Sequence, residues 1–403
     1  MGMAAWTSGD SPLAPFADGF RRELLNQGRP AGAAKHHLVL MGQLSRWLMS
    51  RGTGVDGLTD SCAALFLDDV RAGGRRRVPT MASLSPLLGY LRAMDVVPPV
   101  TSPVRTRRDD FLARYREHLT SDRGLTPSTT LRYERFARRF LADRAERGVG
   151  EIGVEGLDSA AIHEYLLHVS ARLTVASVKR EGADLRALLR FLYLAGDTTT
   201  DLGTAMPPVA NWRLTNLPPD MPATQVSALL ESCDRTTASG RRDHAILLLL
   251  ARLGLRSGEV AAMELQDLDW RAGEVLVRGK ARRQDRLPLP VEIGESLVAY
   301  LTQGRPRCPF PQVILTLHAP PRPIHPSSIT NVVHRACRRA GVAEVGGHRL
   351  RHALATEMLR QGGNLIEIAQ VLRQSDLGTT AVYAKVDRAA LLSVARPWPG
   401  ADR

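Results

Sequence analysis

The chain has 403 residues, of which 44% are hydrophobic, so it can form two or three domains that each bury a core. No stretch approaches the roughly 18 apolar residues of a membrane helix, the start resembles no signal peptide, and four scattered cysteines without a CxxC motif argue against a disulfide framework or zinc site. The net charge of +13 favours a polyanionic partner, so we expect a soluble, cytoplasmic protein that associates with the nucleoid and with no membrane.

The first half of the chain predicts two helical blocks of similar layout. Apolar residues at three- and four-residue spacing predict about four short helices in 16–92 and again in 111–195. We interpret the blocks as a degenerate repeat, although two unrelated amphipathic bundles would give the same pattern. Segments 95–108 and 198–222 are rich in proline and polar residues, which is typical of linkers.

The remainder predicts a mixed domain. Residues 241–255 are apolar enough for a buried helix, and 274–279 can pair with 285–290 as a β-hairpin. Three amphipathic helices are expected at 327–341, 348–362 and 364–374. The fold class is therefore mainly α with a small β-sheet. Three domains are predicted: an N-terminal helical domain at 1–100, a second helical domain at 107–200 and a mixed C-terminal domain at 215–403.

Arg256 follows the long apolar helix and stands three residues before Glu259. The two side chains can meet across one helical turn. The pair could simply close a helix junction, or the arginine could serve a site.

Lys280 lies at the expected tip of the hairpin in a chain where only four of the 54 Lys and Arg residues are lysine. A basic tip suits a DNA groove, and surrounding cations lower the pKa of an ammonium towards the range of a proton donor. Alternatively, Lys280 is one of the few lysines that remain by chance in a chain that otherwise uses arginine. The expected DNA contacts of the tip are Arg278, Arg282, Arg283 and Arg286.

Helical spacing places His348, Arg351 and His352 on one face. Two histidines at this spacing could bind zinc, but the metalloprotease helix has glutamate where this chain has Arg349, and the cation of Arg351 disfavours a metal. An arginine beside a histidine suits a phosphate, because guanidinium binds two oxygens while imidazole moves a proton. No metal or other cofactor is expected.

Tyr383 completes a possible reaction. A phenol with a pKa of about 10 is a poor nucleophile, but cations around a phosphodiester would stabilise both its phenolate and the transition state. Lys280 fits the acid for the leaving oxygen and His348 fits the base.

These residues lie in four segments that resemble the motifs of the tyrosine recombinase, or phage integrase, family. GLRSGEV resembles its first arginine box, VRGKARRQDRLPLP its hairpin with the catalytic lysine, HRLRHALAT its second box and LRQSDLGTTAVYAKV its nucleophile box. The resemblance implies a catalytic domain over 215–403 preceded by a core-binding domain over 107–200. It also implies a 3′-phosphotyrosine intermediate and strand exchange in a tetramer, without ATP or magnesium.

The resemblance assigns roles to individual residues. Arg256 and Arg351 would clamp the phosphate, Lys280 would be the general acid, His348 the base and Tyr383 the nucleophile, while Glu259 and His352 would support the site. Gln374 stands where the family usually has histidine or sometimes tryptophan. Its amide donates a hydrogen bond but carries no proton or charge, so we expect slower cleavage.

The predicted function is a site-specific recombinase, or integrase, that acts on double-stranded DNA for a mobile element. A homotetramer on DNA is expected, with the option of other recombinase subunits. Residues 1–100 could contact a second DNA segment or a neighbouring protomer, and the apolar helix expected over 387–400 could dock in cis or on a protomer. A cleavage-deficient DNA-binding accessory protein and a type IB topoisomerase-like enzyme are the alternatives.

Overall fold

The structure is a computed structural model that describes residues 11–73, 79–99, 105–204, 206, 221–279 and 283–374. The chain divides into two compact units, one of residues 100–215 and one that contains 1–99 and 216–403. The second unit holds separate hydrophobic cores in its N-terminal and C-terminal parts. The predicted division into three domains stays a prediction.

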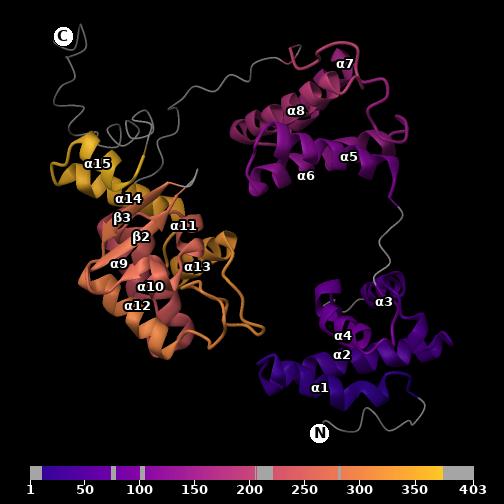
Figure 1. Ribbon diagram of the computed structural model, residues 1–403, viewed down its shortest axis with the longest axis horizontal. Coiled ribbons are helices and arrows are strands. Elements are labelled where there is room, and N and C mark those ends of the chain that lie inside the picture. Colours follow the sequence, from indigo (N-terminus) through magenta and orange to yellow (C-terminus); the bar gives the residue numbers. More distant parts are fainter. Residues whose placement is uncertain are drawn as a thin grey trace, which may run out of the picture. The chain divides into compact units, whose positions relative to one another are not determined.

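The unit of residues 100–215 is a four-helix arrangement (Figure 1). Its helices are α5 (Arg107–Glu117), α6 (Pro127–Glu146), α7 (Ser159–Ser170) and α8 (Val175–Leu194), with a short π-helix (His118–Asp122) after α5. Aromatic and leucine side chains, including Phe111, Tyr115, Phe140 and Leu188, form its core. The four helices predicted over 111–195 are present.

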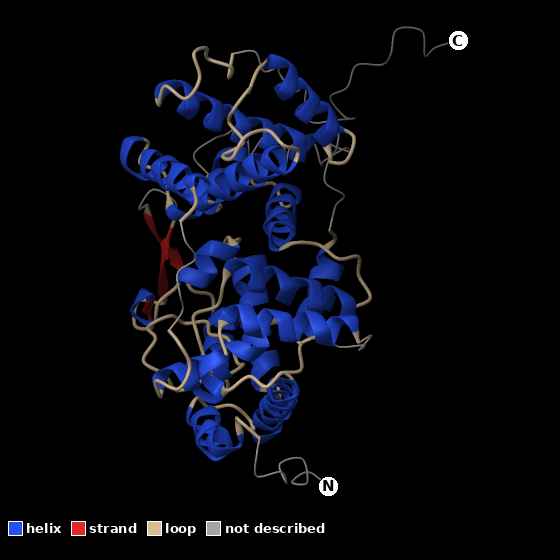
Figure 2. Ribbon diagram, turned by 90° about the vertical axis from the view of Figure 1, so that its right-hand side faces the viewer, coloured by secondary structure: helices blue, strands red, loops and turns tan. Residues whose placement is uncertain are grey.

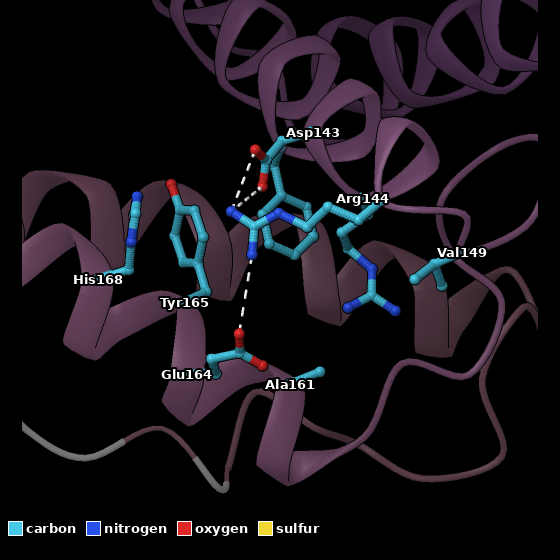
Figure 3. A pocket seen from close by; sticks show the side chains of 9 residues that line it. Asp143, Arg144, Val149, Ala161, Glu164, Tyr165 and His168 are labelled. Atoms are coloured by element: carbon cyan, nitrogen blue, oxygen red, sulfur yellow. Dashed lines mark hydrogen bonds and ion pairs between the residues drawn. The ribbon is translucent and has the colours of Figure 1, made fainter.

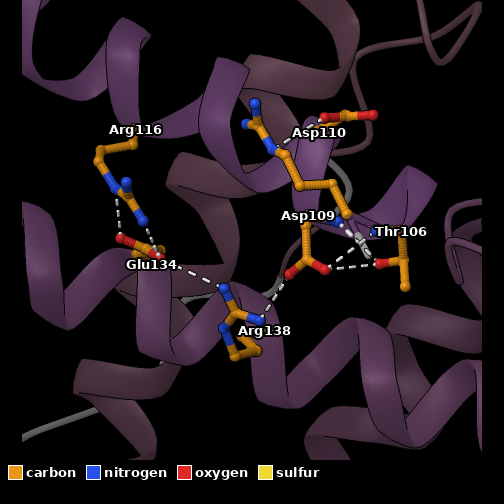
Figure 4. Close-up of polar contacts among 7 residues, drawn as sticks. Thr106, Asp109, Asp110, Arg116, Glu134 and Arg138 are labelled. Carbon is orange, nitrogen blue, oxygen red and sulfur yellow. Dashed lines mark hydrogen bonds and ion pairs between the residues drawn. The ribbon is translucent and has the colours of Figure 1, made fainter. Parts of the chain in front are cut away.

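Ion pairs join α5 to α6 on the surface of this unit (Figure 4). Arg116 binds both carboxylate oxygens of Glu134 at 2.6 and 2.7 Å, and Arg138 donates to Asp109 at 3.0 Å. Hydrogen bonds from Thr106 and from Arg138 lower the pKa of Asp109 to about 2. These arginines are therefore bound to carboxylates within the unit.

The N-terminal part also forms four helices, as predicted for 16–92. They are α1 (Ala17–Asn26), α2 (Ala31–Ser50), α3 (Asp60–Ala72) and α4 (Met81–Ala93), with short 3-10 helices at Ala14–Phe16 and Val55–Gly57. Phe20, Leu44, Phe66 and Leu88 contribute to its core. The second helix of each block has 20 residues, but a repeat of one fold stays a prediction.

The C-terminal part is built around one buried helix, α10 (Ala238–Arg252), in which every residue from Arg242 to Ala251 is buried. α12 (Val291–Gln303), α13 (Pro326–Arg339) and α14 (Gly347–Arg360) pack against it. The remaining helices are α9 (Ala223–Glu231), α11 (Ser257–Ala262), a 3-10 turn (Leu265–Asp267) and α15 (Leu365–Val371).

A small antiparallel sheet completes this part (Figure 2, red). Its strands β1 (Leu268–Asp269), β2 (Glu274–Arg278) and β3 (Gln284–Pro288) follow in chain order, and Leu276 lies opposite Arg286. The predicted hairpin is confirmed, and so is the mainly α fold class with a small sheet.

None of the helices in the described residues is long and apolar enough to span a membrane. Across the same residues, no group of three or more His, Cys, Asp or Glu side chains is placed to hold a metal ion.

Candidate active site

Arg256 is positioned by the start of α11. It is the residue before the helix, and Glu259 in the first turn accepts hydrogen bonds from its backbone N–H at 2.8 Å and from its guanidinium at 2.7 Å. Glu259 is buried, whereas the Arg256 side chain is 44% exposed. The predicted contact is present, and it fixes a guanidinium that still faces solvent.

Arg351 in α14 is fully buried. Its two terminal nitrogens donate to the carbonyl oxygens of Gly254 and Leu372, which are 97 and 21 residues away in the chain. The residue predicted to clamp a phosphate therefore joins the turn before Arg256 to the segment after α15.

Gly254 makes this close approach possible. Its φ is +59°, a conformation that L side chains rarely adopt, and a Cβ atom there would lie 2.7 Å from Leu372 Cδ2. The start of α14 also comes near α11, because a Cβ on Gly347 would lie 3.1 Å from Ser257 Oγ.

His348 and His352 lie on α14 with their rings edge to face and their centroids 4.6 Å apart. His348 is exposed as a residue, but its neighbours partly desolvate it, and this burial together with the cations of Arg351 and Arg256 lowers its pKa. Burial, and then His348, lowers the pKa of His352 to about 4. Both imidazoles are therefore neutral at pH 7, as a general base requires.

Gln374 follows α15 and is partly buried. The residue before it, Arg373, is one that the motif analysis missed: its guanidinium donates to Glu259 at 2.8 Å, and its Nε lies 4.0 Å from Asp285 on β3. A long-range ion pair leaves no periodic signal in a sequence. The only sign of this role in the sequence is that a charged residue, Arg373, stands between the apolar Leu372 and the predicted site residue Gln374.

The hairpin arginines that the structure describes form ion pairs within the protein. Arg278 contacts Glu264 at 2.9 Å and Asp267 at 2.7 Å, and the hydrogen bond to Glu264 is the main cause of its raised pKa. Two others form exposed pairs, Arg283 with Asp285 at 3.1 Å and Arg286 with Glu274 at 3.2 Å. Lys280, Arg282, Tyr383 and the helix expected over 387–400 lie outside the described residues.

A separate hollow lies between α6 and α7 in the unit of residues 100–215 (Figure 3). Arg147 in it pairs with Asp143 at 3.1 Å and with Glu164 at 3.7 Å, and Arg144 donates to the Gly153 carbonyl at 2.8 Å. Its cations are thus matched by acceptors, and no predicted site residue lines it.

The C-terminal part therefore brings together residues from three of the four motifs. Arg256, His348 and Arg351 come from two helix starts that approach each other at Ser257 and Gly347, and Arg373 draws the third segment onto Glu259. An exposed guanidinium beside a neutral imidazole can bind an anionic oxygen and accept a proton.

Comparison with known proteins identifies the family of the chain. A family model described as the phage integrase family matches residues 219–389. "Putative integrase/recombinase y4rA" of Sinorhizobium fredii is 36% identical over 397 residues, which cover 97% of this chain and 96% of the relative. Tyrosine recombinase XerD of Mycobacterium tuberculosis is 31% identical over 307 residues, which cover 72% of this chain and 96% of the relative.

Solved structures share the fold at low sequence identity. XerH site-specific recombinase bound to palindromic difH substrate has a TM-score of 0.54 and 16% identity, over 74% of this chain and 98% of that one. A lambda integrase dimer bound to a COC′ core site has a TM-score of 0.52 and 18% identity, over 72% and 96%. The matched family model, the full-length relative and the shared fold place this chain in the phage integrase family, whose members are tyrosine-type site-specific recombinases.

Proposed function

We propose that the chain cleaves and rejoins double-stranded DNA at specific sites through a 3′-phosphotyrosine intermediate, and that it serves a mobile element. The observation that carries the proposal is the convergence of Arg256, His348 and Arg351 from segments about 90 residues apart. The DNA-bound XerH and lambda integrase structures share the fold and support duplex DNA as the substrate.

The reaction follows from the chemistry of these side chains. The Tyr383 hydroxyl attacks the scissile phosphorus, its proton passes to neutral His348, and the bond to the 5′ oxygen breaks. Lys280 protonates that oxygen, which leaves as a 5′-hydroxyl. Arg256 neutralises the developing charge on the phosphate oxygens, and the 5′-hydroxyl of another strand reverses the step.

In this reaction the buried Arg351 holds two segments of the site together. Its bonds to the Gly254 and Leu372 carbonyls keep the Arg256 turn beside the segment that leads to Gln374. A phosphate contact by the same guanidinium, as the motif implies, stays a prediction. Gln374 supplies a neutral donor where a charged or proton-carrying group is usual.

The assembly we propose is a tetramer on DNA. A lambda integrase tetramer bound to a Holliday junction shares the fold with a TM-score of 0.52 over 77% of this chain. Light scattering should give a tetramer mass on a synthetic four-way junction, and a mass that stays at or below that of a dimer on this junction would contradict this assembly.

A covalent trap tests the chemistry. The protein is incubated without metal with nicked duplexes drawn from DNA that flanks its own gene, and a denaturant-resistant protein–DNA band is expected. Tyr383→Phe should abolish the band, while Tyr193→Phe, at a tyrosine that is 44% exposed on α8, should leave it unchanged. A wild-type band that survives Tyr383→Phe would contradict the assigned nucleophile.

Gln374 favours a second candidate, a DNA-binding accessory protein of the same fold. Replacing this donor by histidine should raise cleavage by about tenfold or more, since removal of one transition-state donor costs about 10²–10³ in rate. If neither wild type nor Gln374→His forms the band while both bind DNA in a salt-sensitive manner, the accessory candidate is favoured.

A further inference from the structure

Arg373 is a buried arginine in a strained backbone conformation. It follows α15 with a φ of +53°, while the N–H groups of Arg373 and Gln374 close the helix end on Gln370 and Ala369 at 2.9 Å. Glycine is the usual residue at this position of a helix end, because L side chains rarely adopt this backbone conformation. Such strain persists where the surrounding structure requires that side chain.

The side chain of Arg373 reaches the centre of the site. It is 3% exposed, and its Nη2 lies 2.8 Å from Glu259 Oε2, while Arg256 holds Glu259 Oε1 at 2.7 Å. One buried carboxylate is thus shared by an exposed guanidinium and a buried one. The Nη1 atom of Arg373 is buried without a hydrogen-bond partner among the described residues, so helix capping and packing do not account for the whole group.

The charges of this cluster explain what the second arginine adds. Arg256 and Glu259 alone sum to zero, and a carboxylate in direct contact weakens the attraction of Arg256 for a phosphate. Asp285, 4.0 Å from the Nε of Arg373, is itself paired with Arg283 at 3.1 Å, so the three arginines and two carboxylates together carry one net positive charge. We propose that Arg373 is a positioning residue that offsets Glu259 and keeps the charge of Arg256 available to the scissile phosphate.

This inference rests on the proposed function and deepens it. Position 374 carries a neutral glutamine, so this position brings no cation to the site. The adjacent arginine places a fixed positive charge within one residue of that position. The charge of Arg373, acting through Glu259, thereby partly compensates for the charged donor that the active site lacks at position 374.

Four variants separate charge from packing. Arg373→Met removes the charge and keeps an unbranched side chain at the same strained φ, and Arg373→Lys keeps the charge. Glu259→Gln keeps an acceptor for the Arg256 backbone N–H, and combined with Arg373→Met it restores the net charge of the cluster. Cleavage of the nicked duplex should fall about 10- to 100-fold in Arg373→Met and stay within about threefold of wild type in Arg373→Lys, and the double variant should cleave at least about threefold faster than Arg373→Met.

The decisive readout is the charge of the substrate. A methylphosphonate at the scissile position removes one negative charge from the phosphate, so the loss caused by Arg373→Met should shrink to less than about threefold on this substrate. An equal loss on both substrates would show a purely structural role and would overturn the proposal.

The chain offers a matched control at the far end of α10. Buried Asp243 is likewise shared by the buried Arg242 at 2.7 Å and the half-exposed Arg335 at 3.3 Å, and Arg242 lies about 15 Å of helix before the end of α10 at Arg252. Arg242→Met should lower the unfolding temperature but leave cleavage by the folded protein, and its dependence on substrate charge, unchanged. A loss in Arg242→Met that equals that of Arg373→Met on both substrates would also overturn the proposal.

A readout without cleavage distinguishes this inference from the proposed function. Sulfate presents tetrahedral anionic oxygens, so its increase of the unfolding temperature, relative to chloride at equal ionic strength, should be smaller in Arg373→Met than in wild type and Arg242→Met. If wild type forms no Tyr383-dependent adduct but this difference persists, the proposed function fails and the role of Arg373 at an anion site stands. Equal sulfate effects in the three proteins would overturn the role of Arg373, whether or not wild type cleaves DNA.

Discussion

Replacing Gly254 by alanine should destabilise the C-terminal part and misplace Arg351. The glycine has a φ of +59°, where an L side chain costs roughly 1–2 kcal/mol. Its new Cβ would lie 2.7 Å from Leu372 Cδ2 and 3.1 Å from Leu354 Cδ2, and overpacking of this kind costs roughly 1–3 kcal/mol. Leu372 is fully buried against Ala355 and Ile368, so it has little room to move.

The sum predicts a loss of about 2–5 kcal/mol in the free energy of unfolding, measured by urea denaturation. Cleavage should fall as well, since the Gly254 carbonyl is an acceptor for Arg351. Gly258→Ala, four residues further on, is the matched control: it lies in α11 with nothing within 4 Å of the added Cβ, and should be neutral or stabilising by up to about 1 kcal/mol. A Gly254→Ala protein as stable as the Gly258→Ala protein would refute the reasoning about this turn.

The remaining predictions concern pH, capping and the hairpin. His352 has a pKa of about 4 in the folded protein, against 6.5 for an ordinary histidine, so between these pH values the folded state binds fewer protons than the unfolded state. Its contribution to the free energy of unfolding should be complete above pH 6.5 and fall by on the order of 3 kcal/mol as the pH drops to about 4. His352→Gln should flatten this part of the curve of unfolding temperature against pH, and an unchanged curve would contradict the assigned pKa. Asp158, which caps α7 through a 2.8 Å bond, should cost about 1 kcal/mol of unfolding free energy when replaced by alanine and much less when replaced by asparagine. Arg286→Ala should reduce the salt dependence of DNA affinity by about one counterion. Arg278→Ala breaks two internal ion pairs and should act mainly on the free energy of unfolding. Equal effects of the two variants on the slope of DNA affinity against salt would contradict this distinction.

Local patterns in the sequence predicted the helices and the hairpin. The 3.6-residue spacing of apolar residues marks α13 and α14 because one face of each packs on the core, and alternation marks β2 for the same reason. The contact between Arg256 and Glu259 was also predictable, since it spans three residues. Such features depend on neighbours within a few positions along the chain.

Contacts between distant segments account for what the sequence could not predict. The burial of Arg351 depends on carbonyl oxygens 97 and 21 residues away, and the role of Arg373 depends on a carboxylate 114 residues away. Arg278 belongs to a basic stretch that suggests DNA contact, but the acidic residues that engage it come from the turn before β1. Charge counted along a sequence does not show which cations already have a carboxylate partner.

The measurement that tests the central claim most directly is identification of the residue joined to DNA in the trapped adduct. The protein is digested after the trap, and the peptide that carries nucleotide is sequenced by mass spectrometry, while the freed strand end is tested for phosphorylation by polynucleotide kinase. We predict a 3′-phosphate ester on Tyr383 and a 5′-hydroxyl that accepts label without prior dephosphorylation. A linkage to another residue, or a 5′-phosphate on either product, would contradict the account.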